Sequence, residues 1–201
     1  METTETVFIG LGSNLGDSAQ LLREGWELLG RRQGISLDTI SLPYLSSPVG
    51  MASNFWFTNA VGKLTTSRTA GEILDLLLDT ERRLGRTRDA VKKGYQDREI
   101  DLDLLYFGAA VIDTPRLTLP HPHRKDRLFV LEPMAAIAPE FIDPETGHPI
   151  AEMHRRLTQR IESGKIAAQE ISAGAWPLPA GRGVGCGDGP HILWRLLASL
   201  V

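Results

Sequence analysis

The residues with the most evident chemistry form an alternating acidic stretch, Arg98-Glu-Ile-Asp-Leu-Asp-Leu-Leu-Tyr-Phe-Gly108. Side chains alternate between the two faces of a β-strand, so Asp101 and Asp103 share one face and the leucines between and after them take the other. Two carboxylates at this spacing repel each other, and a cation between them relieves the repulsion. Mg²⁺ prefers such oxygen ligands and takes phosphate oxygens at its open positions. The alternative is an exposed strand face on which the paired acids are merely solvated.

Basic residues gather on both sides of this acidic pair, although the chain has a net charge of -3. The run before it contains Arg86, Arg88, Lys92, Lys93 and Arg98, and the run after it contains Arg116, Arg124, Lys125 and Arg127. A polyphosphate with bound Mg²⁺ needs carboxylates for the metal and arginine forks for the phosphate oxygens. Each basic run alone would suit a solvated loop, but together with the acidic pair they predict a phosphate site.

Two further residues extend this hypothesis. His121 lies between prolines in Leu119-Pro-His-Pro-His123, where a stiff backbone could present the imidazole to a phosphate oxygen. Glu81 lies on the apolar stripe of a predicted helix, from where it could reach a base or ribose. The alternatives are a structural or exposed histidine and a carboxylate at the edge of the stripe.

Other classes of protein are disfavoured by what the sequence lacks. It has no G-x-x-x-x-G-K-[ST] loop, and the glycines of Gly10-Leu-Gly-Ser-Asn-Leu-Gly16 do not match the G-x-G-x-x-G spacing. No serine nucleophile elbow occurs, so direct transfer assisted by a metal is the simplest chemistry. A single Cys excludes an internal disulfide, and the charge balance indicates no nucleic-acid partner. With neither a long apolar run nor a targeting pattern, we expect a cytoplasmic protein without a membrane partner.

The predicted elements place these residues in an α+β fold. We expect strands over 6–12, 35–45, 55–64 and 100–107, helices over 18–32, 69–84, 128–137 and 150–161, and a hairpin around 108–112. This order is typical of a ferredoxin-like, mostly antiparallel sheet with helices on its faces, an αβα sandwich. One domain is expected over residues 1–165, followed by a Gly/Pro-rich, loosely ordered C-terminal tail over 166–201.

Several motifs together resemble one enzyme family. They are Ile9-Gly-Leu-Gly-Ser-Asn-Leu-Gly16, Ser47-Pro-Val-Gly50, Phe57-Thr-Asn-Ala-Val61, the Glu81–Arg88 run, Asp97-Arg-Glu-Ile-Asp-Leu-Asp-Leu-Leu105 and Leu119-Pro-His-Pro-His with Arg127-Leu-Phe-Val-Leu-Glu-Pro133. The chain is similar to the 6-hydroxymethyl-7,8-dihydropterin pyrophosphokinases of folate biosynthesis over roughly residues 6–160. The resemblance implies Mg²⁺-dependent transfer of pyrophosphate from ATP to the pterin hydroxymethyl group, which leaves AMP and the pterin diphosphate.

The resemblance also implies roles for individual residues. The catalytic set is Arg86, Arg98, Asp101 and Asp103, with two Mg²⁺ ions held by Asp101 and Asp103. The ATP-binding set is Glu81, Arg88, Leu104, Arg116, Leu117, Thr118, His121 and Arg127. The pterin-binding set is Ser46, Pro48, Val49, Gly50, Phe57, Asn59, Tyr95 and Phe129. Tyr95 is expected as a lid over the pterin, because Gly94-Tyr-Gln-Asp-Arg98 stands where family members often carry Trp-Gly-Pro-Arg. The implied partners are small molecules only, and the protein is expected to be a monomer.

Two other functions stay open at this point. A different Mg²⁺-dependent nucleotide enzyme, such as a nucleotidyltransferase, could use the same acidic strand face and would release pyrophosphate. A ferredoxin-like module could instead bind nucleic acid with its sheet, which usually requires aromatic and basic residues on the central strands. Here the corresponding face carries Asp101 and Asp103, which disfavours that function.

Overall fold

The computed structural model describes residues 4–50, 53–86 and 97–177. Its elements in chain order are β1 (Glu5–Ser13), α1 (Ser18–Gly30), β2 (Ile35–Ile40), β3 (Tyr44–Ser46), β4 (Phe57–Thr66), α2 (Ala70–Arg83), β5 (Asp101–Phe107), β6 (Ile112–Asp113), β7 (Thr118–Leu119), the 3₁₀ turn η1 (Arg124–Asp126), α3 (Leu128–Ile137), α4 (Ile150–Glu162) and β8 (Ile171–Ala173). None of the helices in the described ranges is long and apolar enough to cross a lipid bilayer.

The main sheet is built from antiparallel pairs in the order β5-β1-β4-β3-β8, with β2 also paired to β4. Its centre is the long ladder between β1 and β4, which runs from Glu5 opposite Thr66 to Ser13 opposite Thr58. The expected mixed fold with an antiparallel sheet and covering helices is therefore confirmed.

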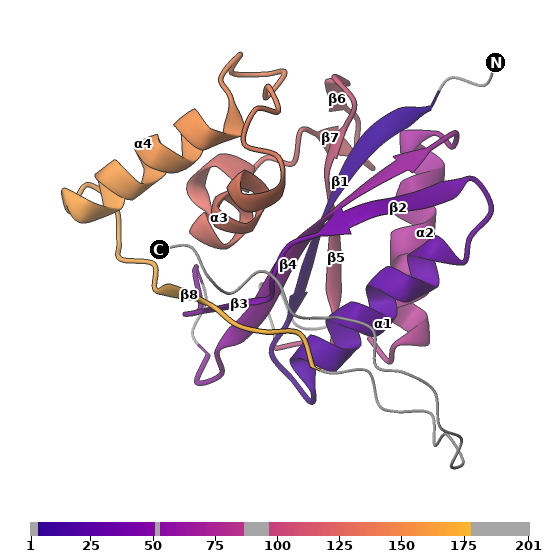
Figure 1. Ribbon diagram of the computed structural model, residues 1–201, viewed down its shortest axis with the longest axis horizontal. Coiled ribbons are helices and arrows are strands. Elements are labelled where there is room, and N and C mark those ends of the chain that lie inside the picture. The colour runs from indigo at the N-terminus through magenta and orange to yellow at the C-terminus, as the bar shows by residue number, and fades with distance from the viewer. Residues whose placement is uncertain (1–3, 51–52, 87–96, 178–201) are drawn as a thin grey trace, which may run out of the picture.

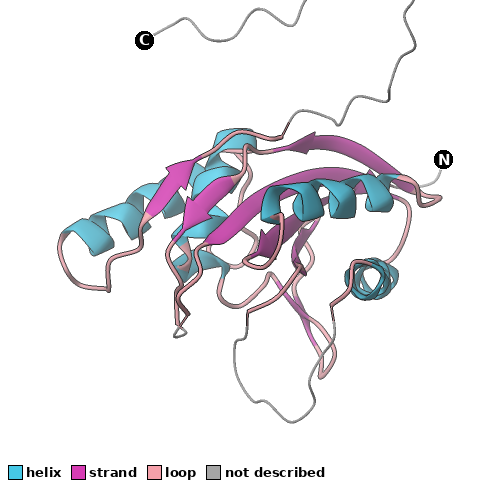
Figure 2. Ribbon diagram, turned by 90° about the horizontal axis from the view of Figure 1, so that it is seen from below, coloured by secondary structure: helices cyan, strands magenta, loops and turns pink. Residues whose placement is uncertain are grey.

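The helices form a layer on each face of the sheet (Figures 1 and 2). On one face, α1 and α2 pack on β1, β4 and β5 through a core that includes Leu22, Trp26 and Ile73. On the other face, α3 and α4 pack through a second core that includes Phe8, Leu131 and Leu157. Each strand of the sheet centre therefore has two environments, one on each side.

The first two helices begin at caps that the sequence encodes locally. The Asp17 side chain accepts a hydrogen bond from the N–H of Gln20 at the start of α1. Thr69 and Glu72 form a reciprocal capping box at the start of α2. In contrast, α3 begins after Arg127, whose side chain makes no capping hydrogen bond. The N–H groups at the start of α3 must find acceptors elsewhere.

Two expected local elements differ in the structure. The strand expected over 35–45 is divided into β2 and β3, because the chain leaves β4 after Ser41 and passes through Pro43, which has no N–H to donate. The expected hairpin around 108–112 does not pair with β5; Ile112 and Asp113 pair instead with β7 as a separate ribbon. A short, weakly patterned strand finds its partner through tertiary packing, which local residue types do not specify.

The beginning of the expected C-terminal tail is also different. Residues 171–173 form β8, which adds an edge strand beside β3 (Figure 1). Beyond it, Trp176 packs against the core beneath α1 and α2, and its indole N–H donates to the Ser41 carbonyl at 3.0 Å. The expectation of a loose tail is therefore wrong for this part of the tail. Residues 178–201 lie outside the described residues, and the domain boundary at residue 165 stays a prediction.

Candidate active site

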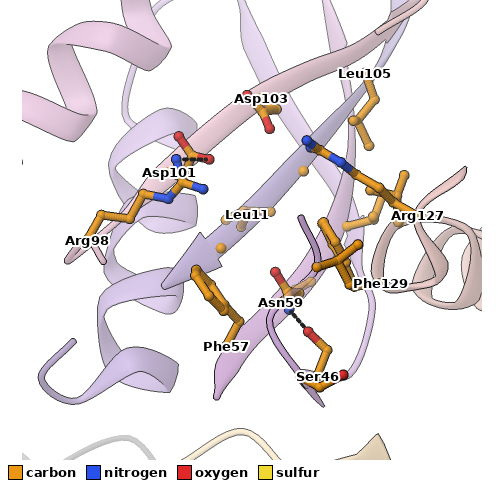
Figure 3. Close-up of a pocket in the computed structure, with 17 residues that line it drawn as sticks. Leu11, Ser46, Phe57, Asn59, Arg98, Asp101, Asp103, Leu105, Arg127 and Phe129 are labelled. Atoms are coloured by element: carbon orange, nitrogen blue, oxygen red, sulfur yellow. Dashed lines mark hydrogen bonds and ion pairs between the residues drawn. The ribbon is translucent and has the colours of Figure 1, made fainter. Parts of the chain in front are cut away.

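The acidic pair on β5 has the geometry that the alternation predicts. Leu102 and Leu104 lie in the core beneath α1 and α2. Asp101 and Asp103 point to the opposite face, where both line one hollow between the sheet and α3 (Figure 3). The hollow has a volume of about 630 Å³ including its open mouth, which lies within the usual range for small-molecule sites.

Arginines from separate parts of the chain converge on these carboxylates. The Arg98 Nη1 lies 3.0 Å from the Asp101 Oδ2, and Arg86 pairs with both Asp101 and Glu81. Arg127, which precedes α3, lines the same hollow on the side of Asp103 (Figure 3). Positive charge therefore surrounds the acidic pair, as the two basic runs predict.

The electrostatics of Asp103 explain why this arrangement suits a cation. Burial and the charge of Asp101 raise the pKa of Asp103 to about 7, although Arg127 and Arg98 oppose the shift. The neighbouring arginines therefore balance the negative charge of Asp103 only in part. A divalent ion beside it would stabilise its charged form. No cluster of three or more His, Cys, Asp or Glu side chains with metal-site spacing occurs among the described residues. Two carboxylates therefore fit an ion that takes its other ligands from water and phosphate, as Mg²⁺ does.

Arg98 is held in place by a residue that sequence reasoning missed. The Asn14 Oδ1 accepts from the Arg98 N–H at 2.8 Å, and the Asn14 N–H donates to the Arg98 carbonyl at 3.1 Å. The Asn14 amide also donates to Asp97 at 2.5 Å. The available signal was the Gly-Ser-Asn-Leu-Gly turn that follows the first strand, since such a turn places a side-chain amide beside backbone groups.

Glu81 and His121 lie next to the acidic pair without lining the hollow. Glu81 is buried, and its Oε1 accepts from the Leu102 N–H at 2.8 Å while it pairs with Arg86. The His121 N–H donates to the Leu105 carbonyl at 2.9 Å, which holds the loop beside β5. Burial and the nearby Arg127 lower the pKa of the His121 ring to about 4, so the imidazole is neutral at physiological pH.

The other end of the hollow is aromatic and amide-lined. Phe57 from β4 and Phe129 from α3 lie on either side of Asn59 (Figure 3). The Asn59 Nδ2 donates to the Ser46 Oγ at 2.9 Å, so β3 and β4 together orient the amide. A Cβ on Gly12 would lie 3.1 Å from the Asn59 Oδ1, so glycine lets β1 pass close to this group. The arrangement suits a flat heteroaromatic ring with hydrogen-bonding edges.

Comparison with known proteins agrees with this geometry. The family model for 7,8-dihydro-6-hydroxymethylpterin-pyrophosphokinase (HPPK) matches residues 8–139. The chain belongs to this family. It is 35% identical over 144 residues to the 2-amino-4-hydroxy-6-hydroxymethyldihydropteridine pyrophosphokinase of Pseudomonas aeruginosa, covering 72% of this chain and 87% of that protein. The protein of the same name in Bacillus subtilis is 39% identical over 130 residues, covering 65% of this chain and 76% of that protein. As a member of this family, the chain is a diphosphotransferase.

A solved structure shows the same fold. The wild-type HPPK-DHPS of Plasmodium falciparum superposes with a TM-score of 0.65 at 13% identity, covering 82% of this chain and 46% of that one. The chain thus spans about half the length of that two-part protein. The HPPK fold is retained at this low identity because the layers depend on the pattern of buried residues more than on their identities.

The structure brings together many of the predicted site residues. Those that line the hollow are Ser46, Val49, Phe57, Asn59, Arg98, Asp101, Asp103, Arg127 and Phe129. The described residues of the predicted set that do not line it are Pro48, Gly50, Glu81, Arg86, Leu104, Arg116, Leu117, Thr118 and His121. Arg88 and Tyr95 lie outside the described residues. The hollow thus brings predicted metal, phosphate and pterin residues together.

Three of the residues that do not line the hollow have other surroundings. The Leu104 side chain is buried beneath α1 and α2, and Leu117 packs at the edge of the same core. Arg116 is exposed and pairs with Asp75 of α2. Arg124, grouped in the sequence with the cations of the second basic run, is 1% exposed and pairs with the buried Asp143. The grouping of Arg124 with the phosphate-site cations is therefore wrong, because its charge is neutralised inside the protein.

Proposed function

We propose that this protein catalyses the Mg²⁺-dependent transfer of pyrophosphate from ATP to 6-hydroxymethyl-7,8-dihydropterin in folate biosynthesis, giving AMP and the pterin diphosphate. The observation that carries this proposal is the division of one hollow into two ends. Asp101, Asp103, Arg98 and Arg127 line one end, while Phe57, Asn59 and Phe129 line the other. A phosphate donor and a flat acceptor could therefore meet between the two.

Asp101 and Asp103, which line the phosphate end, would hold two Mg²⁺ ions there. The ions would supply charge stabilisation for the transferring pyrophosphoryl group. In the free protein, Arg86 and Arg98 neutralise Asp101. We expect the phosphates to take over part of this pairing, so that the guanidinium groups bind the oxygens on which charge develops.

The remaining residues would position the two substrates. Asn59 would bond the polar edge of the pterin, with Phe57 and Phe129 against its ring and with Ser46, Pro48, Val49 and Gly50 completing the slot. Arg88, His121 and Arg127 would contact the nucleotide phosphates. Glu81, Leu104, Arg116, Leu117 and Thr118 would lie near the nucleotide, and Tyr95 would cover the pterin. Transfer of this kind depends on in-line placement and on exclusion of water more than on covalent chemistry. We expect a cytoplasmic monomer with small-molecule partners only.

The test is a reaction of the purified protein with ATP, Mg²⁺ and the reduced pterin alcohol. We expect AMP and the pterin diphosphate in equal amounts, and no AMP when the pterin or Mg²⁺ is omitted. Release of pyrophosphate instead of AMP would indicate a nucleotidyltransferase and would refute the proposal. Formation of ADP would refute it as well, because a single phosphoryl group would then have moved.

A further inference from the structure

The segment that follows α4 lies outside the matched family region, which ends at residue 139, and returns to the loop before α3. Within this segment, the Gln169 side chain hydrogen-bonds the main chain of the loop before α3. The Gln169 Oε1 accepts from the Leu128 N–H at 2.8 Å, and the Gln169 Nε2 donates to the Asp126 carbonyl at 2.9 Å. One side-chain amide thus binds the main chain on both sides of Arg127.

This contact supplies what the start of α3 lacks. Arg127 occupies the N-cap position without making a side-chain cap, so an acceptor for the Leu128 N–H has to come from elsewhere. Gln169 is that acceptor, from a residue far along the chain. Its second hydrogen bond holds the preceding carbonyl, so the direction in which the chain enters α3 is held on both sides.

Gln169 is itself well anchored. The main chain of the next residue, Glu170, makes two hydrogen bonds with Ser47: the Ser47 N–H donates to the Glu170 carbonyl at 3.0 Å, and the Glu170 N–H donates to the Ser47 side-chain Oγ at 3.1 Å. The chain then continues as β8 along β3, with Ile171 opposite Ser46. Because these contacts use the main chain, replacing the Gln169 side chain leaves the anchor in place.

Arg127 is the site residue whose main chain Gln169 holds. It lines the hollow, and its charge acts on Asp103 by opposing the rise of that pKa. Its guanidinium carbon also lies 5.4 Å from the centre of the Phe129 ring, which lines the aromatic end of the same hollow. A small rotation of the Arg127 main chain would move its guanidinium relative to both Asp103 and the Phe129 ring.

We propose that Gln169 is a positioning residue for Arg127: by binding the main chain on both sides, it aims the guanidinium at the phosphate end of the hollow. This inference rests on the proposed function, in which Arg127 contacts the nucleotide phosphates. A segment outside the matched family region therefore takes part in the active site without touching a substrate.

The test is a double-mutant cycle with Gln169→Met and Arg127→Ala, read as kcat/KM for ATP at saturating pterin. Met has a similar length and forms neither hydrogen bond. We expect Gln169→Met to lower kcat/KM by about fivefold to tenfold, the size of an effect from about one net hydrogen bond. In the Arg127→Ala background the same change should cost less than about twofold, since a residue that acts through Arg127 has nothing left to position.

Two further variants separate positioning from a general structural role. Gln169→Glu keeps the acceptor for the Leu128 N–H and should recover part of the activity that Met loses. Glu170→Gln is the matched control, because the bonds of Glu170 to Ser47 use its main chain, and its activity should equal that of the wild type. Thermal unfolding of every variant shows whether the fold is retained.

An equal loss from Gln169→Met in both backgrounds would overturn the inference, and so would no loss in either. If the wild-type protein forms no AMP, it is the proposed function that fails. An active wild type whose Gln169→Met variant is unchanged would refute only the positioning role. The two failures are therefore distinguishable in one set of assays.

Discussion

Two clusters of arginines and carboxylates lie along the same strand, β5, and differ in almost every physical respect. At the start of the strand, Asp101 and Asp103 line a hollow together with Arg98 and Arg127. Near its end, Tyr106 belongs to a cluster with Arg124 and Asp143 that is closed to solvent. The two clusters use the same kinds of charged group, so residue type alone does not decide what such a cluster does.

In the closed cluster, the hydrogen-bonding groups are paired with one another. Arg124 donates to both Asp143 oxygens at 2.6 and 2.9 Å, and the Tyr106 hydroxyl and two backbone N–H groups also donate to this carboxylate. Although burial alone would raise it, these hydrogen bonds hold the pKa of Asp143 at about 2. A fully bonded internal pair has little capacity for a ligand, and its role is to join the loop of His121 to the turn after Asp143.

The open cluster leaves charge to be neutralised. The pKa of Asp103 is raised to about 7 by burial and by Asp101, the opposite direction from Asp143. Unbalanced charge beside a hollow is costly to the free protein and useful to a ligand that balances it. A buried ion pair whose donors and acceptors are all bonded within the protein is therefore structural, whereas one that leaves charge unbalanced beside a hollow can bind a ligand.

The largest expected effect tests the open cluster. Asp103→Asn should reduce transfer by about 10⁴-fold or more, because charge stabilisation by a bound metal is worth several kcal/mol. Stability should not fall. Because the pKa of Asp103 is higher in the folded than in the unfolded protein, the folded protein loses stability as pH rises from about 4 to about 7. Asn has no proton to lose in this range, so the substitution removes this loss.

Activity assays and urea unfolding at pH 8 check both parts, with Glu99→Gln as a neighbouring control. An Asp103→Asn protein that keeps most of its activity would contradict the metal role. A protein that loses its fold would show that the cluster is structural, like the one around Asp143.

The next effect concerns Arg98. Arg98→Ala should lower kcat by about 10²- to 10³-fold, the usual result of removing one group that stabilises developing charge. The dissociation constant for ATP should change far less, because the interaction strengthens in the transition state. Steady-state kinetics and calorimetric titration measure the two quantities, and equal losses in both would mean that Arg98 binds the ground state.

The closed cluster is tested by stability instead. Arg124→Met should lower the free energy of unfolding by about 3–5 kcal/mol, since it leaves the buried Asp143 without its partner. The exposed Lys125→Ala is the matched control and should change stability by less than about 0.5 kcal/mol. Urea unfolding at pH 7 measures both. A loss below about 1 kcal/mol for Arg124→Met would remove the distinction between the two clusters.

The smallest effect is a pH dependence at the loop that lies between the clusters. The pKa of the His121 ring is lowered to about 4 in the folded protein, against about 6.5 in an unfolded chain. The unfolded state therefore binds the proton more readily, so stability is full above about pH 6.5 and falls as pH drops toward 4. His121→Gln should reduce the loss of stability between pH 7.5 and 5 by at most about 2 kcal/mol. Unfolding at the two pH values checks this, with the exposed His123→Gln as control; identical slopes for wild type and His121→Gln would contradict it.

The difference between the clusters also shows where sequence reasoning reaches its limit. The alternation of Asp101 and Asp103 with leucines is a local property of an extended chain, so their shared face could be predicted. Arg124 and Arg127 are three residues apart in one basic run, and nothing local indicates that one is buried and the other lines the hollow. Their separation depends on Asp143, which lies 19 positions beyond Arg124.

The sequence by itself determined the main helices and the long strands, the ferredoxin-like order and the acidic face, because periodicity and capping act over a few residues. Only the tertiary structure decided which cations reach the carboxylates, that Asn14 holds Arg98, and that Gln169 returns to the start of α3. It also decided that the weakly patterned residues 171–173 become a strand, since β3 offers them an unpaired edge. These contacts join residues that are distant along the chain, and their free energy exists only once the layers have packed.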